Sequence, residues 1–519
     1  MTELPKGWAT AKFSDFGEWM GGGTPSKAVP SYWNGPIPWV SPKDMKTKVI
    51  RSAIDGITEA AVENSSAKRV PAGSVLIVAR SGILAHTLPI AVTAVEATLN
   101  QDMKALTLSG GISSDFIAWG LRAFEQAILN KCRKGGTTVH SIEMPSLVAF
   151  ELPIPPTNEQ RRIVQKIEAM FEQIDKGVES LAVAKTTLGL YRQSLLKSAF
   201  EGRLTAAWRA QNPDKLETPK ALLARIQKER ETRYKSALDD WQAALSEWRA
   251  GGEVGRKPGK PSRPAEIDPQ HISEDAKPDY PSSWGSLRLG GLSIAVSDGP
   301  FGSNLKTSDY TTTGIQVVRL ENIGYGQFIT DKQTFVSQEK YETIAGHTIY
   351  PGTIVVSSFV TDAVRSCVVP ASVPIAVNKA DCFAVVLEGE RTSREFLAYY
   401  LQCGQVFKQL ESLIHGVGRP RINTTQLKEL HFPICSPAEQ AEIIRILDTR
   451  LTAADRMEAE IDAALSRAAA LRQSILKRAF AGNLVPQEPT DEPAPTLLTR
   501  IKAERAKAEK NKQRRTAHA

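Results

Sequence analysis

A segment of about fifty residues occurs twice in this chain, and this duplication constrains the fold more than any other feature. Residues 152–204 and 432–484 align without a gap at an offset of 280 positions. The run Arg192–Lys197, for example, returns almost unchanged as Arg472–Lys477. A register that is kept over this length predicts one structural element that is built twice.

Both copies are predicted to be long helices. Thr157 with Gln160 fits a capping box at the start of the first, and Ser436 with Glu439 at the start of the second. Apolar residues then recur on one narrow face with a mean spacing of about 3.6 residues. At 1.5 Å per residue, each helix would extend roughly 60 Å.

Because the other faces are polar, each helix needs one partner, and the obvious partner is its twin. The alternative is an ordinary helical hairpin inside a larger core. The residues that we assign to helix pairing are Ile163, Ile167, Ile174, Val178, Leu181, Leu188, Leu195, Ile443, Leu447, Leu451, Ile461, Leu465, Leu471 and Ile475.

Composition limits the class of protein. With 519 residues the chain has room for two or more domains, and its 41% apolar and 24% charged residues are typical of a soluble globular protein. No signal peptide and no apolar run of membrane-spanning length is found, so we expect no membrane association. Five scattered cysteines argue against a disulfide framework or a zinc knuckle and fit a reducing cytoplasm, and metal binding has no support.

The net charge of +8 is concentrated at one end of the chain. Residues 497–519 hold eight Lys or Arg against Glu504 and Glu509, so this tail supplies +6. The remainder of the chain is close to neutral. The overall charge therefore supports a polyanionic partner only weakly.

The duplication continues outside the helices. Leu4-Pro-Lys-Gly-Trp8 parallels Tyr280-Pro-Ser-Ser-Trp284, and residues 222–230 resemble residues 497–505. We expect an α/β (α+β) protein with two mixed α/β domains, at 1–151 and 280–431. The long helices occupy 152–204 and 432–484, a linker that is helical over 218–249 and then flexible occupies 205–279, and a basic helical tail occupies 485–519.

Between their matching ends the two domains have little in common. The first contains Gly21-Gly-Gly-Thr-Pro-Ser, and the second contains Gly299-Pro-Phe-Gly-Ser-Asn-Leu-Lys. Duplicated frames with different contents suggest that the two domains recognise two different things.

These features together resemble the specificity subunit of type I restriction-modification enzymes. The residues that carry the resemblance are the helix starts (Pro153-Ile-Pro-Pro-Thr-Asn-Glu-Gln and Pro433-Ile-Cys-Ser-Pro-Ala-Glu-Gln), the two helix ends and the two glycine loops. The resemblance covers nearly the whole chain. It implies two target recognition domains that each read half of a split, asymmetric double-stranded DNA site, and two helices that pair as an antiparallel coiled coil.

The resemblance also implies partners. In that family the helices set the gap between the half-sites and dock two methylation subunits, which carry S-adenosylmethionine and methylate adenine. A separate motor-nuclease subunit uses ATP and Mg²⁺ and joins through the complex. We therefore expect no cofactor on this chain and no catalysis by it alone.

Motif analysis supports a non-catalytic chain. No Asn-Pro-Pro-Tyr-type methylase motif and no Walker loop is present in the sequence. Two other classes stay open. A stand-alone DNA methyltransferase or nuclease is disfavoured by the missing motifs. A coiled-coil scaffold that binds DNA without sequence specificity is disfavoured by two domains with divergent interiors.

Candidate DNA contacts are basic and amide side chains near loops and strand ends, because these groups reach base edges and phosphates. A solvated connector, a polar surface or simple turn formation explains most of them equally well. The candidates are Lys43, Lys46, Arg80, Lys131, Arg133, Lys134, Thr137, Thr138 and His140 in the first domain, and Lys306, Arg319, Arg365, Arg419, Arg421 and Asn423 in the second.

Overall fold

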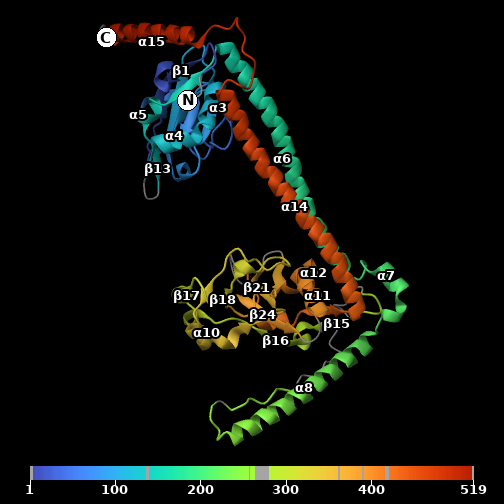
Figure 1. The fold of residues 1–519 in the computed structure, drawn as a ribbon. Helices are drawn as coiled ribbons and strands as arrows, with labels where there is room; N and C mark the ends of the chain where they lie inside the picture. The colour runs from blue at the N-terminus through green and yellow to red at the C-terminus, as the bar shows by residue number, and fades with distance from the viewer. Residues whose placement is uncertain are drawn as a thin grey trace. The chain divides into compact units, whose positions relative to one another are not determined.

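The computed structural model describes residues 4–135, 139–255, 257–263, 280–360, 363–387, 391–414 and 420–516. The chain forms two compact units (Figure 1). Unit 1 comprises Met1–Val183 and Ile461–Ala519, and unit 2 comprises Ala184–Glu460. Each unit contains one mixed α/β domain and one half of each long helix, so the predicted fold class is confirmed.

The domain of unit 1 has a five-stranded sheet of order β2-β11-β7-β9-β4 and a four-stranded sheet of order β5-β3-β10-β6. Its strands are β1 (Ala9–Lys12), β2 (Gly17–Gly21), β3 (Trp33–Val40), β4 (Val49–Ile50), β5 (Asp55–Ile57), β6 (Arg69–Val70), β7 (Val75–Val78), β8 (Arg80–Ser81), β9 (Ile90–Thr93), β10 (Ala97–Leu99), β11 (Met103–Leu108), β12 (Arg133–Lys134), β13 (His140–Ile142) and β14 (Glu151–Ile154). Its helices are α1 (Phe13–Phe16), α2 (Glu59–Glu63), α3 (Ser114–Ala123), α4 (Glu125–Cys132) and α5 (Met144–Val148).

The domain of unit 2 repeats this plan with a four-stranded sheet of order β16-β24-β21-β22 and a five-stranded sheet of order β17-β19-β18-β23-β20. Its strands are β15 (Gly285–Arg288), β16 (Ser293–Ser297), β17 (Tyr310–Thr311), β18 (Ile315–Val318), β19 (Phe335–Val336), β20 (Thr348–Ile349), β21 (Ile354–Val360), β22 (Val364–Val368), β23 (Ala376–Asn378), β24 (Cys382–Leu387) and β25 (His431–Ile434). Its helices are α9 (Leu289–Leu292), α10 (Gln338–Ile344), α11 (Arg391–Leu401), α12 (Gly404–Leu410) and α13 (Thr424–Lys428).

Central strands with continuous apolar runs lie between two cores in each domain. Along β7, Val75 and Ile77 face one hydrophobic cluster, whereas Leu76 and Val78 face another. Because successive side chains of a strand point to opposite faces, a strand that is covered on both sides must be apolar throughout. In unit 2, β21 divides in the same way.

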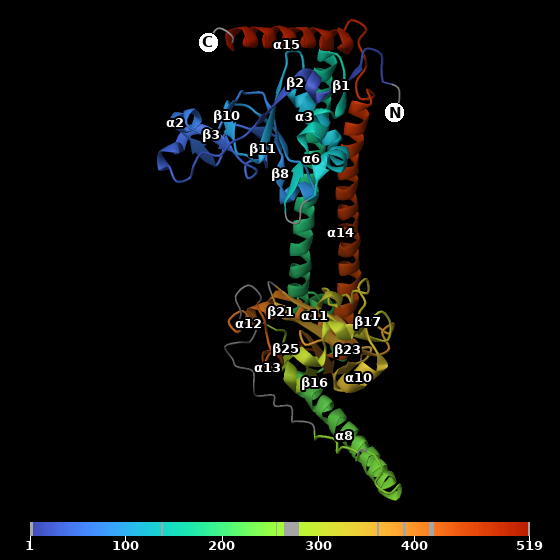
Figure 2. The same ribbon diagram turned by 90° about the vertical axis from the view of Figure 1, so that its left-hand side faces the viewer.

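The two long helices, α6 (Thr157–Phe200) and α14 (Pro437–Phe480), contain 44 residues each. In unit 1, Arg472 of α14 binds Asp175 of α6. In unit 2, Arg192 of α6 binds Asp455 of α14 at 2.6 Å. The two arginines are repeat equivalents, and so are the two aspartates. Both units therefore make the same Arg–Asp contact, but α14 supplies the arginine in unit 1 and α6 supplies it in unit 2. Figure 2 shows α6 and α14 side by side.

Most of the predicted pairing residues are covered. Ile163, Ile167, Leu188, Leu195, Ile443, Leu447, Ile461 and Ile475 are buried, and Ile174, Val178, Leu181, Leu451 and Leu465 are partly buried. The prediction that Leu471 takes part in helix pairing is wrong, because this residue is 49% exposed. The neighbouring Arg472 turns toward α6 instead, where Asp175 binds it. One residue is a rotation of about 100° on a helix, so Leu471 faces outward when Arg472 faces α6.

The end of each long helix is buried in the domain that comes from the other half of the sequence. At the end of α6, Phe200 packs on Phe396 in unit 2, with ring centroids 5.1 Å apart. At the end of α14, Phe480 packs on Phe116 in unit 1, with ring centroids 4.9 Å apart. Phe116 and Phe396 are again repeat equivalents, in α3 and α11.

A glycine at φ +71° (Gly202) or +73° (Gly482) follows each helix end. A Cβ at Gly202 would overlap Pro281, and one at Gly482 would overlap Pro5. Both the left-handed backbone and the close approach of a proline therefore require glycine here.

The segment that follows each long helix packs on the domain in which that helix ends. Leu222 at the start of α8 (Pro219–Ala250) is buried in unit 2, and Leu497 of α15 (Ala494–Thr516) is buried in unit 1. Arg230 then donates to the Gly291 carbonyl of α9 at 2.6 Å, and Arg505 donates to the Ser14 carbonyl of α1. Residues 222–230 and 497–505, which are similar in sequence, thus make the same kind of contact with their domains.

The linker in unit 2 also contains α7 (Ala206–Gln211). The helix that was predicted over 218–249 is present as α8. Residues after it pack back on the helix, since Trp241 Nε1 donates to the Pro258 carbonyl at 3.1 Å. The flexible segment that was predicted over 251–279 lies, from 264 onward, outside the described residues.

Each domain is joined to the start of its long helix through a buried Glu-Gln pair. Trp8 Nε1 donates to Glu159 Oε1 at 3.1 Å in unit 1, and Trp284 Nε1 donates to Glu439 Oε2 at 2.9 Å in unit 2. The neighbouring glutamines, Gln160 and Gln440, donate to the backbone carbonyls five residues earlier, at 3.0 and 2.9 Å.

These bonds correct the predicted capping boxes. Thr157 lies inside α6 and donates to the Gly111 carbonyl at 2.8 Å rather than capping the helix. Ser436 does accept from the Glu439 amide at 3.3 Å. The Glu439 carboxylate, however, binds Trp284.

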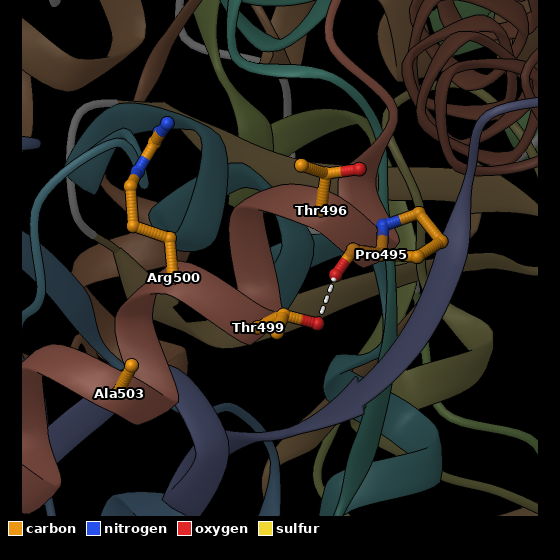
Figure 3. A pocket seen from close by; sticks show the side chains of 5 residues that line it. All are labelled: Pro495, Thr496, Thr499, Arg500 and Ala503. Atoms are coloured by element: carbon orange, nitrogen blue, oxygen red, sulfur yellow. Dashed lines mark hydrogen bonds between the residues drawn. The ribbon is translucent and has the colours of Figure 1, made fainter.

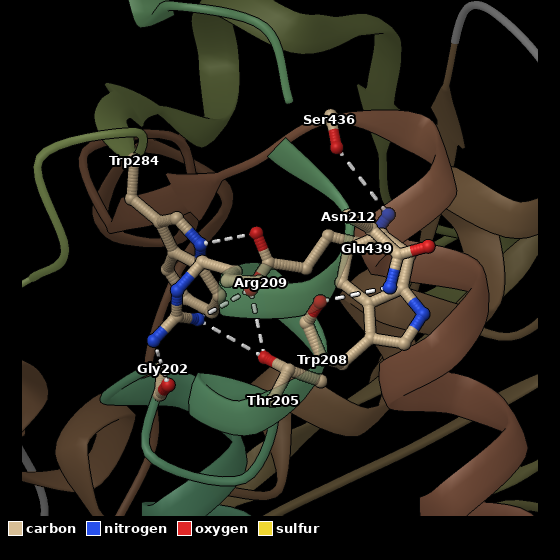
Figure 4. Close-up of polar contacts among 8 residues, drawn as sticks. All are labelled: Gly202, Thr205, Trp208, Arg209, Asn212, Trp284, Ser436 and Glu439. Atoms are coloured by element: carbon tan, nitrogen blue, oxygen red, sulfur yellow. Dashed lines mark hydrogen bonds and ion pairs between the residues drawn. The ribbon is translucent and has the colours of Figure 1, made fainter. Parts of the chain in front are cut away.

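The two glutamates differ in their charge partners. Glu439 also accepts from Thr205 Oγ1 at 2.7 Å and is ion-paired with Arg209 (Figure 4). The residues at the same repeat positions in unit 1 are Val485 and Pro489, which offer no such donors. Burial raises the pKa of Glu159, although the Trp8 bond and the charge of Arg162 act in the opposite direction.

Because the end of α6 is buried in unit 2, we predict that Phe200→Ala destabilises unit 2, although Phe200 follows the first domain in sequence. The loss of a buried phenyl ring should cost about 3–5 kcal/mol. Hydrogen exchange, resolved by peptide, should show increased opening of residues 280–430 and little change in residues 4–150. Phe480→Ala should do the reverse, and Leu190→Ala, on an exposed face, is the control. Opening of residues 4–150 in Phe200→Ala would contradict this packing.

The two glutamates should respond oppositely to removal of their charge. A raised folded pKa means that the contribution of Glu159 to stability is complete below its unfolded pKa and is lost as pH rises through the folded value. Glu159→Gln keeps an acceptor for Trp8, so unit 1 should gain up to about 1 kcal/mol at pH 7 and nothing at pH 4. Glu439→Gln leaves the Arg209 guanidinium without its carboxylate and should cost unit 2 about 3 kcal/mol. Chemical denaturation with a probe in each unit measures both, and an equal loss in the two variants would refute the asymmetry.

Candidate nucleic-acid interface

Several of the predicted basic residues meet on one three-stranded ribbon of unit 1, in the order β12-β13-β8. Ser141 of β13 pairs with Lys134 on one side and with Arg80 on the other. Lys131 lies just before this ribbon, in the last turn of α4. Thr137 and Thr138 lie outside the described residues.

The side chains of this ribbon have different partners. Arg80 Nε donates to Asp102 Oδ1 at 2.7 Å, and the arginine side chain is 61% exposed. Arg133 is held by the domain itself, because it donates to the Leu84 and Ala85 carbonyls, both at 3.1 Å. Lys131 Nζ lies 5.8 Å from the centroid of the Phe150 ring. His140 is partly buried, and its Nδ1 has no hydrogen-bond partner.

In unit 2 the equivalent position holds a single bridge between Phe359 and Arg421. The Arg421 guanidinium lies 4.3 Å from the Phe359 ring centroid and pairs with Asp381 at 3.4 Å. Its side chain is 52% exposed. Asn423 caps α13, where its Oδ1 accepts from the Gln426 amide at 2.8 Å. Arg419 lies outside the described residues.

The aspartates that hold these arginines occupy the same turn in both domains. The Arg80 amide donates to the Asp102 carbonyl at 3.1 Å, and the Ser358 amide donates to the Asp381 carbonyl at 3.0 Å. At this turn each domain therefore pairs a half-exposed guanidinium with a carboxylate. Arg80 and Arg421, however, come from opposite strands of the equivalent ribbon.

The predicted glycine loops pack beside this turn. A Cβ at Gly22 would overlap the Asn100 carbonyl, and one at Gly299 would overlap the Asn378 carbonyl. Close approach of two backbones thus explains the glycines. Lys306, at the end of the second loop, is exposed, and its amide donates to Asp309 at 2.7 Å.

The remaining candidates lie elsewhere. Lys43 and Lys46 are exposed in the loop between β3 and β4. Arg319 pairs with Glu321 at 3.1 Å, and Arg365 donates to the Leu320 carbonyl at 3.2 Å. Arg365 therefore holds the backbone around residues 320–323, whereas the Arg319 side chain is bound by side chains. The role of both arginines in DNA contact stays a prediction.

Residues that the sequence reasoning missed include Asp102 and Asp381, which orient the exposed arginines. Their signal was an aspartate two or three residues after an asparagine, in Asn100-Gln-Asp and in Asn378-Lys-Ala-Asp. Tyr191 is a further surface residue that the sequence reasoning did not single out. It is 43% exposed.

The described part of the chain was also compared with the requirements of metal sites, reactive cysteines and membrane spans. No cluster of three or more His, Cys, Asp or Glu that could hold a metal ion occurs there. All five cysteines are free and buried, and burial raises the pKa of Cys367 and of Cys382 to about 12. None of the described helices combines the length and the hydropathy needed to cross a membrane.

A pocket of about 510 Å³ lies along α15 (Figure 3). It is lined by Pro495, Thr496, Thr499, Arg500 and Ala503. The Thr499 hydroxyl donates to the Pro495 carbonyl at 2.8 Å, and Arg500 pairs with Glu492 at 2.9 Å. Its main polar groups are thus engaged by the protein itself.

Comparison with known proteins identifies the fold and the repeat. The family model "Type I restriction modification DNA specificity domain" matches residues 5–180 and 281–467. One structure, titled as the basis of complex assembly and conformational transition of the type I R-M system, aligns with a TM-score of 0.58 at 16% identity, over 93% of this chain and 100% of that one. That likeness supports the fold.

Curated relatives match in part. The specificity subunit of the Escherichia coli enzyme EcoR124I/EcoR124II is 43% identical over 175 residues, which are 33% of this chain and 43% of that protein. The MjaIX specificity subunit of Methanocaldococcus jannaschii is 28% identical over 37% of this chain and 44% of its own length. The match thus spans less than half of either relative. The Escherichia coli EcoDI specificity subunit is 24% identical over 76% of this chain and 77% of its own length.

The family model covers both domains and continues into both long helices. The matched residues together are more than half of the chain. The chain therefore belongs to the family of type I restriction-modification DNA specificity domains.

Proposed function

We propose that this chain is the sequence-recognition subunit of a type I restriction-modification complex, in which each domain reads one half of a split, asymmetric DNA site. The observation that carries the proposal is the pair Arg80 and Arg421. Each is half exposed at the equivalent edge of its domain and is held by a carboxylate. A guanidinium that is already oriented loses less freedom when it binds a guanine edge or a phosphate.

The different origin of the two arginines fits two different half-sites. Arg80 projects from β8, whereas Arg421 comes from the segment that pairs with the end of β21. Lys134 and His140 lie on the same ribbon as Arg80, and Lys131 lies just before it, whereas Phe359 stacks on Arg421. Different neighbours present different donors and apolar groups to a groove, and such differences are what distinguish base sequences.

The outer faces of the paired helices suit a protein partner. Tyr191 and Leu471 are repeat equivalents, and they are 43% and 49% exposed. Val183 and Leu190 on α6 and Met457 on α14 are exposed as well. Two equivalent apolar faces fit two copies of one partner, and we assign them to two methylation subunits. S-adenosylmethionine belongs on those subunits, and ATP and Mg²⁺ belong on motor-nuclease subunits that join through the complex.

The deciding experiment maps adenine methylation in a host that expresses this chain with its methylation partner, against a host without this chain. One split, asymmetric motif should lose its methyl groups on deletion. Exchange of residues 4–150 for another such domain should change one half of that motif only. If no motif changes although the partner is active, the recognition role is refuted and a non-specific scaffold is favoured.

The same map tests the two arginines. Arg80→Ala should cost about 1–3 kcal/mol in binding and relax one half of the motif, and Arg421→Ala should relax the other half. Asp102→Asn should have a smaller effect in the same half as Arg80→Ala, because it loosens the guanidinium without removing it. Lys68→Ala, an exposed lysine of the first domain, is the control. Relaxation of both halves by one variant would contradict one domain per half-site.

If the methylation subunits dock on the outer faces of α6 and α14, each face should bind one methylation subunit. Tyr191→Asp places a charge in one apolar face and should reduce the methylation subunits bound per chain from two to one, because a central aromatic contact is worth about 2 kcal/mol or more. Leu471→Asp should do the same at the other face, and the double variant should bind none. Native mass spectrometry counts the subunits. Two bound subunits in the double variant would exclude these faces.

A further inference from the structure

In unit 1 a lysine of the globular domain reaches the long helix. Lys48 lies in the loop between β3 and β4, and its Nζ lies 5.0 Å from the Trp119 ring centroid and 5.7 Å from the Phe171 ring centroid. Trp119 belongs to α3 and Phe171 belongs to α6. Both rings are buried and meet edge to face, with centroids 5.0 Å apart. The ammonium group is thus attracted by two rings that already join the domain to the helix.

The backbone of Lys48 is tied to the sheet of its domain. Its carbonyl accepts from the Val92 amide of β9 at 2.9 Å. A displacement of the domain relative to α6 would therefore pull the ammonium group from the two rings. Lys48 connects the sheet with the helix at a place well separated in sequence from the β1–β14 pair at the helix start.

In unit 2 a glutamine makes the corresponding connection. Gln327 Nε2 donates to Asp455 Oδ2 of α14 at 3.1 Å. The loop that carries Gln327 is held by two backbone bonds, from the Gly324 amide to the Gln327 carbonyl and from the Gly326 amide to the Ser366 carbonyl, both at 3.0 Å. This loop therefore transmits the position of the domain to the helix.

Both connections reach the helices at the interhelical Arg–Asp pair. Asp455, which binds Gln327, also binds Arg192. Phe171, which lies beneath Lys48, also lies 6.0 Å from the Arg472 guanidinium, and Arg472 binds Asp175. Asp175 and Asp455 are repeat equivalents. Two chemically different contacts within one helical turn of the same repeated Arg–Asp pair point to a shared role in holding the domain, rather than to a shared residue type.

We propose that Lys48 and Gln327 are positioning residues, which fix the orientation of each domain on the helix pair and thereby select the gap between half-sites. This inference rests on the proposed function. Each domain is attached at its base through β1–β14 or β15–β25 and through the buried Glu-Gln pair. A second contact farther along the helix prevents rotation about that base. Successive base pairs are about 3.4 Å apart, so even a small rotation brings the reading edge to the neighbouring base pair.

The test measures discrimination between gaps. The full chain, assembled with its methylation subunits, is given duplexes that carry the mapped site with the native gap or with one base pair more or fewer. Initial methylation rates give the ratio of native to altered gap. Lys48→Met keeps the aliphatic stem and removes the charge, and the ratio should fall roughly 2- to 5-fold, as expected for the loss of a cation–π contact.

Matched variants separate positioning from general stability. Lys48→Arg keeps a cation over the rings and should restore the ratio. Gln327→Glu places a carboxylate opposite Asp455 and should lower the ratio more than Gln327→Leu does. Lys68→Met, in the same domain, should leave it unchanged. The half-site bases should be the same in every variant.

An unchanged ratio in both Lys48→Met and Gln327→Glu would overturn the inference. An equal loss of rate at all gaps together with a lower melting temperature would overturn it as well, because that pattern indicates a structural role only. Failure of the proposed function is a separate result, since the unmodified complex would then methylate no split site at all.

Discussion

Burial of each helix end in the domain from the other half of the sequence is the constraint on which the structure depends. Phe480, at the end of α14, lies in the core of unit 1 with Phe116. Phe200, at the end of α6, lies in the core of unit 2 with Phe396. Neither domain completes its core from its own half of the sequence. Each domain therefore needs the end of the other half's helix to complete its core, and the antiparallel direction of the helices follows from it.

The helix start makes the complementary connection. The strand that closes each domain leads directly into its long helix, and the buried glutamate at the start binds the tryptophan that opens the same domain. A buried carboxylate is tolerated when it is hydrogen-bonded, and it is stabilised more strongly when a cation neutralises it. Unit 2 supplies Arg209, which is ion-paired with Glu439, whereas in unit 1 the nearby Arg162 is ion-paired with Asp491 instead of Glu159. The duplicated frame is thus the same in geometry and different in electrostatics.

The sequence predicted the parts that repeat and most of the helix seam. Periodicity located α6 and α14 because an apolar stripe of constant spacing is a local property. It failed at Leu471, where Arg472 rather than Leu471 faces α6 and binds Asp175. For a similar reason the capping box at Thr157 was wrong, and the one at Ser436 was only half correct. Thr157 and Glu439 bind Gly111 and Trp284, which are distant in sequence.

Prediction of the candidate site was limited in the same way. The sequence placed basic residues in two equivalent loops, and strand pairing does bring Arg80, Lys134 and Ser141 together. It could not separate Arg80, which is half exposed, from Arg365, which holds backbone carbonyls, because both follow or lie in strands with similar neighbours. Only the fold determines which arginine has a carbonyl within reach. The orienting aspartates were missed because their role requires a partner from another strand.

The two halves diverge at several places where the frame does not depend on residue type. Glycine at 202 and 482 is required by the backbone and by the adjacent proline, so it is the same in both copies. At the domain edge, an aspartate holds an arginine in both units, but the arginine comes from either strand. At the helix contact, Lys48 on two rings and Gln327 on a carboxylate make equivalent connections with unrelated chemistry. Because the frame needs only that a contact exists at these positions, the two domains are free to differ there, and this freedom is what the proposed recognition of two different half-sites requires.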